Sequence, residues 1–256
     1  FLIFNFIMKL KINNSHPRDK RIDFDETNHV YFIDGIPYEL SVTGFIKSFF
    51  EEFDSESVIK KNYAKWQLDK KSKYYGLTVE DIKKSWKKNA EDASNKGSKL
   101  HKDIEAFYND IEFHNDTVEF NFFLSLNDRL KDKFKAYRTE WIIFDEEIKL
   151  AGSVDMCYTD KEGSYYLFDW KRSKQIIKEN NYRKGKYPLN HIDDTNYWHY
   201  ALQLNIYKYI LEKNYMKAIS SLYLVKLHPD QQNYEVIRIP DLTTEVNLMI
   251  KQRIEI

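Results

Sequence analysis

The sequence of 256 residues contains only one cysteine, Cys157. A single cysteine excludes an intrachain disulfide framework and favours a reducing, intracellular compartment over a secreted location. Long hydrophobic runs are also missing, since none comes near the roughly 20 residues of a membrane-spanning helix. The short apolar run at residues 1–8 has no basic region before it, so we expect a first strand or an internal start at Met8 rather than a signal peptide.

The chain lacks an excess of charge of either sign, with 40 basic and 40 acidic residues. This balance argues against a uniformly basic nucleic-acid binder. The G-x-x-x-x-G-K-[ST] motif is absent too, so any nucleotide-driven motor would be a separate helicase chain. With 42% hydrophobic and 16% aromatic residues, the chain can bury a full core, which predicts a single domain over residues 1–256.

Positive charge is nevertheless concentrated in two segments. Residues 60–102 hold 13 lysines against five acidic residues, with aromatic residues interleaved, among them Trp66, Tyr74, Tyr75 and Trp86. Lysines can follow a phosphate backbone and aromatic rings can stack on bases, which predicts DNA contacts from Lys83, Lys84, Trp86, Lys87 and Lys88. The alternative is a solvated helix face over an aromatic core. Thr78 and Asp81 have the spacing of a capping box at the start of a helix.

The second basic segment follows residue 171 and contains Arg172, Lys174, Lys178, Arg183, Lys184 and Lys186. Residues 179–194 include Asn, Gly, Pro and Asp, which predicts a loop. Long loops beside active sites often shape the entry of the substrate. We therefore expect this segment to contribute a second DNA-binding surface.

Residues 150–174 carry the most informative pattern, because two apolar-aromatic runs flank a turn and predict a β-hairpin. Side chains alternate between the faces of a strand, so Asp169 and Lys171 share a face while Trp170 points the other way. The turn brings Asp155 back beside them. Two carboxylates and a lysine then converge on one point. An ordinary exposed hairpin with scattered charges is the alternative.

This trio suits phosphodiester hydrolysis. Carboxylates hold Mg²⁺ or Mn²⁺ through hard oxygen ligands and leave sites for water and phosphate. The metal ion acidifies a bound water and withdraws charge from the phosphate oxygens. A neighbouring lysine can orient that water or stabilise the charge that develops.

Two further pairs of residues have the spacing of one helical turn. His101 and Glu105 follow Gly97, and Gln203 and Tyr207 lie downstream of the hairpin. The alternative to a functional role for the first pair is a solvated pair on a helix face. For the second pair, the alternative is a place in an apolar stripe that faces the core.

A third element is Ser41-Val42-Thr43, which follows a small predicted hairpin at 29–38 that turns at Asp34-Gly35. Hydroxyl groups and free N–H groups at the start of a helix suit an anionic phosphate. A plain Ser or Thr N-cap is the alternative.

The order of these motifs, over roughly residues 29–215, resembles the PD-(D/E)XK nuclease superfamily. The similarity is to its RecB-like and lambda-exonuclease-like group, which includes the mitochondrial genome maintenance exonucleases and viral relatives. The resemblance implies an α/β fold: a restriction-endonuclease-like core of mixed β-sheet flanked by helices, with an N-terminal helical elaboration. Some RecB-like nucleases hold an iron–sulfur cluster with four cysteines, which a chain with one cysteine cannot build alone.

The resemblance also implies roles for individual residues. Asp155 and Asp169 would hold the metal ion, together with the His101 imidazole and the carbonyl of Trp170. Lys171 would position or activate the water, and Glu105 is a further candidate for a catalytic carboxylate. Gln203 and Tyr207 would brace the lysine and contact nucleic acid. Ser41 and Thr43 would bind phosphate.

The expected activity is that of a metal-dependent DNA exonuclease acting on single-stranded or double-stranded ends. A site-specific or structure-specific endonuclease of the same fold is the first alternative. A nucleic-acid-binding module without catalysis is the second, although such a module has no need of the acids and the lysine. The sequence does not define the oligomeric state.

We expect residues 1–110 to form an N-terminal hairpin and helical region and residues 111–256 to form the catalytic core. Residues 1–40 read as strands and turns, and residues 41–110 as helices. Beyond them the patterns predict a helix at 117–138, a strand at 141–148, the hairpin at 150–171, a helix at 196–213, strands at 220–226 and 234–239, and a last helix at 243–256.

Overall fold

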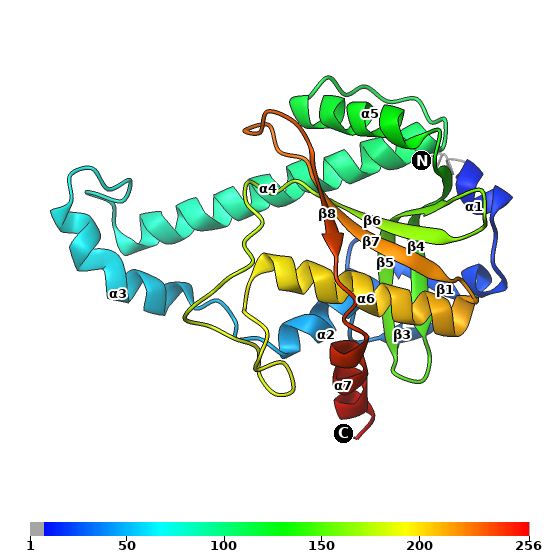
Figure 1. The fold of residues 1–256 in the computed structure, drawn as a ribbon. Helices are drawn as coiled ribbons and strands as arrows, with labels where there is room; N and C mark the ends of the chain where they lie inside the picture. Colours follow the sequence, from blue (N-terminus) through cyan, green and yellow to red (C-terminus); the bar gives the residue numbers. More distant parts are fainter. Residues whose placement is uncertain (1–7, 256) are drawn as a thin grey trace.

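A mixed five-stranded β-sheet forms the centre of the protein in the computed structural model, which describes residues 8–255 (Figure 1). Its strands follow the order β4-β5-β6-β7-β8. Only β6 and β7 are parallel, and the other neighbours are antiparallel. The predicted α/β class with a mixed sheet flanked by helices is confirmed. The bounds are β4 (Lys135–Asp145), β5 (Leu150–Thr159), β6 (Tyr165–Lys171), β7 (Ile219–Lys226) and β8 (Glu235–Ile239).

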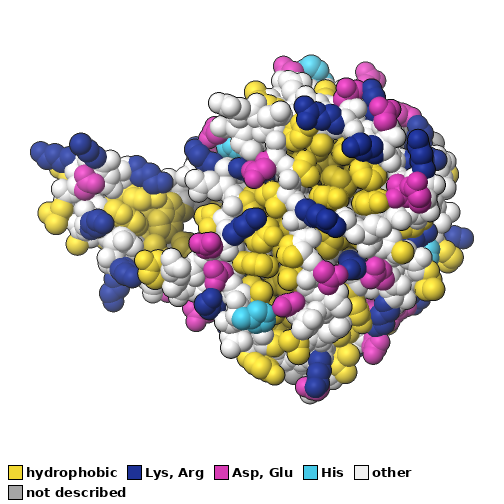
Figure 2. Space-filling model, viewed as in Figure 1, with side chains coloured by type: hydrophobic (Ala, Val, Ile, Leu, Met, Phe, Trp, Pro, Cys, Tyr) yellow, Lys and Arg dark blue, Asp and Glu magenta, His cyan; other side chains and the backbone are white. Residues whose placement is uncertain are grey.

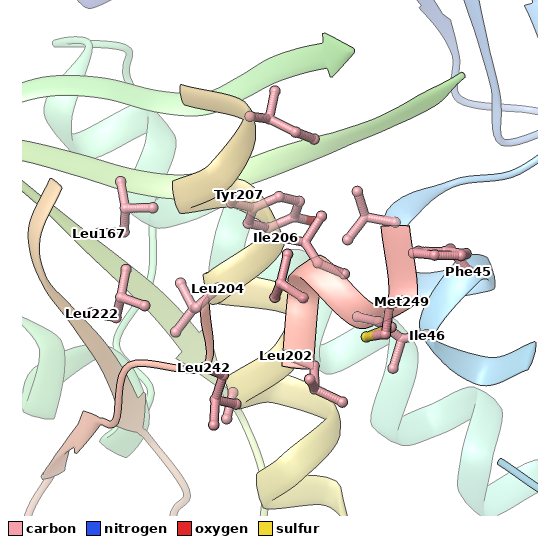
Figure 3. Close-up of a cluster of buried hydrophobic side chains, with 14 of the residues drawn as sticks. Phe45, Ile46, Leu167, Leu202, Leu204, Ile206, Tyr207, Leu222, Leu242 and Met249 are labelled. Atoms are coloured by element: carbon pink, nitrogen blue, oxygen red, sulfur yellow. The ribbon is translucent and has the colours of Figure 1, made fainter. Parts of the chain in front are cut away.

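One face of the sheet is covered by α6 (Asn196–Tyr215), which connects the parallel strands β6 and β7. Parallel neighbours need such a crossover, because a tight turn cannot join them. The helices α2 (Val42–Ser48) and α7 (Thr243–Ile254) pack beside α6. Figure 3 shows Leu202, Leu204 and Ile206 of α6 among side chains from both helices and the sheet.

The opposite face is covered by the second half of α4 (Val79–Tyr108) and by α5 (Val118–Leu130). Phe168 and Trp170 of β6 pack against these helices, while Leu167 packs toward α6. The alternation expected for β6 is therefore present. It leaves Asp169 and Lys171 on the face opposite to Trp170.

A separate three-stranded sheet lies beside β4 and β5. It consists of β1 (Ile22–Asp25), β2 (Val30–Ile33) and β3 (Ile36–Tyr38), and the predicted hairpin turns at Asp34-Gly35 with positive φ at both residues. The strands are preceded by α1 (Lys9–Asn13) and a 3-10 helix (Pro17–Lys20), where we expected only strands and turns. The expected strand or start within residues 1–8 lies almost wholly outside the described residues.

The helix α3 (Ser55–Leu68) and the first half of α4 form an arm that projects from the body (Figure 1). The predicted capping box at Thr78 and Asp81 begins α4. Trp66, Tyr74 and Trp86 pack on one another, with ring centroids 4.5 to 6.2 Å apart. The indole N–H of Trp86 also donates to the Tyr74 hydroxyl at 2.7 Å. These rings therefore form the small core of the arm.

One element was predicted wrongly. The helix expected at 117–138 ends at Leu130, and β4 begins at Lys135 instead of near residue 141. The segment pairs with β5 along most of its length and buries Trp141, Ile143 and Phe144. This pairing with a strand outweighs the local preference for helix, which a sequence pattern alone does not register. No helix among residues 8–255 is both long and apolar enough to cross a membrane.

A buried ion pair ties the N-terminal 3-10 helix to β4. The Asp19 carboxylate lies 2.7 Å from the Arg138 guanidinium, and the two side chains are 8% and 3% exposed. The indole N–H of Trp141 donates to the same carboxylate at 3.2 Å. The N-terminal segment is therefore part of the folded core of the protein.

We predict that Asp19→Ala lowers the free energy of unfolding by about 3–5 kcal/mol, because it leaves the Arg138 charge buried without a partner. Chemical denaturation measures this loss. The control is Asp128→Ala, which removes an exposed ion pair with Lys131 and should cost about 1 kcal/mol or less. Equal losses in the two variants would contradict the structural role of Asp19.

Candidate metal centre

The β5–β6 hairpin brings Asp155 beside Asp169, Trp170 and Lys171, as the sequence predicts. The backbone N–H of Trp170 donates to the Asp155 carboxylate at 2.9 Å. This bond fixes the orientation of a side chain that is only 8% exposed. Burial raises the pKa of Asp155, although the positive charges of His101 and Lys171 oppose the rise.

The carboxylate of Asp169 is almost fully buried, at 2% side-chain exposure. The Lys171 ammonium lies 2.7 Å from its Oδ2 atom, and its Oδ1 atom has no hydrogen-bond partner among the described residues. Burial, with a further contribution from the charge of Asp155, raises the pKa of Asp169 to about 7. A buried carboxylate with unused lone pairs is the expected condition of a group that receives a ligand.

His101 reaches the same point from the opposite side of the sheet, on α4. Its Nε2 atom lies 2.8 Å from the carbonyl oxygen of Trp170. Its Nδ1 atom lies 3.4 Å from the Glu140 carboxylate and 3.5 Å from the Asp155 carboxylate. Burial alone would lower the pKa of His101, but the two carboxylates raise it to about 9. Both ring nitrogen atoms of the imidazole therefore lie close to carboxylate or carbonyl oxygen atoms, which carry full or partial negative charge.

Glu140 is a member of the site that sequence reasoning missed. It lies on β4 between the residues that pair with Met156 and Val154, the two neighbours of Asp155 on β5, and has a φ of +40°. A non-glycine residue in this region is uncommon, and such backbone strain concentrates at functional sites. The Ser153 hydroxyl donates to its carboxylate at 3.0 Å. Only knowledge of the β4 register could have placed Glu140 here, because no motif surrounds it.

The donors fit a divalent metal ion. One ligand atom each from His101, Glu140 and Asp155 can be chosen so that all lie within 4.8 Å of one another. The unpartnered Oδ1 atom of Asp169 and the carbonyl of Trp170 are close by in the same strand pair. Carboxylate, carbonyl and imidazole donors together suit a hard or borderline cation. These residues could therefore hold a metal ion.

Glu105 lies one turn from His101 on α4, as the spacing predicts, and lines a cavity next to the centre. Burial, together with the charge of Glu140, raises the pKa of Glu105 to about 7. It does not belong to the group of donors within 4.8 Å of one another. The structure therefore places Glu105 beside the centre.

Gln203 and Tyr207 contact each other, since the Gln203 amide donates to the Tyr207 hydroxyl at 2.9 Å. No hydrogen bond among the described residues joins Gln203 to Lys171. The Lys171 ammonium instead lies 4.8 Å from the ring of Tyr200, which sequence reasoning also missed. The Tyr207 ring packs against Gly152 of β5, where an added Cβ would lie 2.7 Å from the ring. Gly152 is therefore required for this close approach.

The hydroxyl groups of the Ser41-Val42-Thr43 element serve the helix itself. Ser41 caps α2 by accepting the backbone N–H of Gly44 at 3.1 Å, and its hydroxyl lies 3.0 Å from that of Thr43. Ser41 also forms a parallel β-bridge with Ala151, next to Gly152. The plain N-cap interpretation accounts for these contacts.

Most cations of the loop after β6 are neutralised within the fold. Arg172 pairs with Glu119 at 2.5 Å, and the other three pairs are Lys174 with Asp230, Arg183 with Asp194, and Lys184 with Asp193. The Lys186 ammonium donates to the carbonyl of Ser48 at 3.4 Å. These contacts fix the loop and its connection to α2, and they reduce the charge that the loop can offer to DNA.

The arm retains more available charge. Lys83 is half-buried and pairs with Glu56 at 2.6 Å, whereas Lys84, Lys87 and Lys88 are exposed. Of these three, only Lys87 has an acidic neighbour among the described residues, at 3.9 Å. Figure 2 shows Lys and Arg side chains over the outer surface of the arm, around the hydrophobic side chains of its core.

Comparison with known proteins gives little further information. No protein-family model matches the chain, and no curated protein matches it. One solved structure, of the protein SSO0001, is 20% identical over 52% of this chain and 56% of its own length, with a TM-score of 0.28. Another, a candidate exonuclease from Eubacterium rectale, is 14% identical over 84% of this chain and 78% of its own, with a TM-score of 0.38. The assignment of function therefore depends on the site itself.

We predict that Gly152→Ala destabilises the protein by about 1–3 kcal/mol, because the new methyl group overlaps the Tyr207 ring. In a Tyr207→Ala background the ring is gone, so the same substitution should cost much less. Chemical denaturation of the four proteins in this double-mutant cycle measures the coupling. Strictly additive losses would show that Gly152 and Tyr207 do not constrain each other.

Proposed function

We propose that the protein is a metal-dependent deoxyribonuclease, and that it acts as an exonuclease on DNA ends. The observation that carries this proposal is the buried Asp169 carboxylate, whose Oδ1 atom has no hydrogen-bond partner among the described residues although the Lys171 ammonium lies 2.7 Å from the other oxygen. The charges of Asp155 and His101 act on the same carboxylate. The sequence resemblance to RecB-like nucleases supports the same chemistry, and it is the source of the preference for DNA ends.

The proposed cofactor is Mg²⁺ or Mn²⁺, held by Asp155, Asp169, the Trp170 carbonyl and His101, with Glu140 as an additional donor. When bound, such an ion supplies Lewis-acid activation of the phosphate and of the attacking water. The ordered hydrogen bond from Trp170 N–H to Asp155 holds that carboxylate in position without side-chain rearrangement.

Lys171 is the proposed group next to the reacting water. Its ammonium is held between the Asp169 carboxylate and the Tyr200 ring, and the two acids raise its pKa although burial opposes this. It is therefore positively charged at neutral pH and can orient a water molecule and stabilise negative charge on the phosphate. In the hydrolysis, water adds its oxygen to phosphorus, the bond from phosphorus to the leaving oxygen breaks, and that oxygen takes up a proton.

We predict that Asp155→Ala, Asp169→Ala and Lys171→Ala each reduce DNA cleavage by roughly 10³-fold or more, because each removes charge stabilisation worth several kcal/mol. The assay uses end-labelled linear, closed circular and single-stranded DNA with Mg²⁺, Mn²⁺ or EDTA. Linear DNA should shorten from its ends, while closed circles survive.

The matched control is Glu162→Ala, which removes an exposed carboxylate in the turn of the same hairpin and should leave the rate unchanged. Full activity of a folded Asp169→Ala protein would contradict the proposed function. Rapid nicking of closed circles would instead identify an endonuclease.

We also propose that the arm binds DNA through Lys84, Lys87 and Lys88. Their replacement by Gln should weaken binding to all sequences alike and reduce the salt dependence of the affinity. Each lost phosphate contact should change the slope of log K against log salt by about 0.7 for a single strand. The measurement is fluorescence anisotropy at several salt concentrations. Lys133→Gln, Lys149→Gln and Lys251→Gln together form the control, and an equal effect of the two triple variants would contradict a specific role of the arm.

A further inference from the structure

A cavity of about 610 Å³ opens next to the candidate metal centre. The described residues that line it come from α1, the 3-10 helix, β1 and the turn after it, the second half of α4, and the β4–β5 pair, with Met8 before α1. His101, Glu140 and Ser153 belong both to this wall and to the metal centre. If a phosphate binds at the metal centre, a chemical group that extends from it toward His101, Glu140 and Ser153 must therefore enter the cavity.

Part of the wall contributed by the sheets is apolar, beside the polar residues Arg138, Thr139, Glu140 and Ser153. Ile22, Phe24 and Ile142 line it, and none of these residues has a counterpart in the nuclease motifs of the sequence. The ring of Phe24 stacks on the ring of Tyr31, with centroids 4.5 Å apart, and meets His29 edge-on at 5.1 Å. Phe24 is therefore supported on two sides by other rings. A supported aromatic ring suits the flat face of a nucleic-acid base.

Cationic groups contribute to the outer part of the cavity. Lys11 and Lys102 both line it and are both exposed. Lys102 pairs with Glu26 at 3.2 Å, and both side chains are well exposed to solvent. Ion pairs this exposed contribute little to stability, so either lysine can contact a phosphate at small cost.

We propose that this cavity receives the terminal nucleotide of a single DNA strand, with its base against Phe24 and its phosphodiester at the metal centre. The inference rests on the proposed nuclease function and specifies its substrate. A volume of about 610 Å³ lies within the range of roughly 300–1,000 Å³ for small-ligand sites. In this proposal the strand end is unpaired when it is cut, because the cavity takes one nucleotide with its base against Phe24.

Two readouts test the cavity, and the first needs no cleavage. Binding of thymidine 5′-monophosphate and thymidine 3′-monophosphate is measured by calorimetry with Ca²⁺ in place of the catalytic metal. Wild-type protein should bind at least one of them, and Phe24→Ala should weaken that binding roughly 5- to 100-fold, the effect of losing one stacked base. The second readout is the KM for a single-stranded end and the length of the released products.

Two variants control for damage to the fold. Phe113→Ala removes a half-buried phenylalanine that packs on Phe120, away from the cavity, and should change neither readout. Phe24→Leu keeps an apolar side chain against Tyr31 but removes the flat ring. It should weaken nucleotide binding while the protein remains folded, as judged by its unfolding transition.

The outcomes separate this inference from the proposed function. If wild-type protein cuts DNA, but both Phe24 variants bind nucleotide and process ends like wild type, the cavity assignment is wrong and the nuclease stands. The absence of monophosphate binding to wild type would also overturn the cavity assignment. If wild type never cuts DNA, yet binds a monophosphate in a Phe24-dependent way, the nuclease proposal fails and the cavity remains a nucleotide site.

Discussion

The carboxylates of Asp155 and Asp169 are buried at one point of the β5–β6 hairpin. Buried carboxylates require compensating positive charge, and the surrounding structure supplies it. Burial raises the pKa values of both Asp155 and Asp169, and a like charge adds to each rise: that of Glu140 for Asp155 and that of Asp155 for Asp169. The compensating charges come from Lys171 on the same hairpin and from His101 on α4. A divalent cation would complete this compensation and use the Oδ1 atom of Asp169, which has no hydrogen-bond partner among the described residues.

The architecture explains how helices on opposite faces of the sheet meet at this point. The parallel pairing of β6 and β7 requires the crossover helix α6, which places Tyr200 against Lys171 and Tyr207 against Gly152. On the other face, α4 contributes His101. The same helix continues into the arm, and Lys84 lies 17 residues before His101. At 1.5 Å per residue this is about 25 Å, so the arm would contact DNA several nucleotides away from the bond that is cut.

The features that the sequence predicts correctly are those encoded by short-range patterns. The alternation of Asp169, Trp170 and Lys171, the capping box at Thr78 and the turn at Asp34-Gly35 each depend on residues close together in the chain. Hairpin geometry likewise brings Asp155 to its place. Local spacing and the order of the motifs were sufficient to assemble most of the candidate centre.

The remaining features depend on contacts between distant segments. Glu140 joins the site only because β4 pairs with β5 in one register and because its backbone is held at positive φ. The ion pairs of the loop cations are of this kind, since partners such as Glu119 and Asp230 lie 53 and 56 residues away from them in sequence, while the DNA-binding surface expected from these cations stays a prediction. The strand β4 was partly assigned as helix for the same reason, since its conformation is determined by its neighbour.

The most direct test of this account is anomalous diffraction from crystals of the protein soaked in Mn²⁺. The account predicts one strong anomalous peak in contact with Asp155, Asp169, the carbonyl of Trp170 and the imidazole of His101, and the loss of this peak in Asp169→Ala crystals. A peak elsewhere, or no peak at this position at millimolar Mn²⁺, would contradict the assignment of the buried carboxylates as a metal centre.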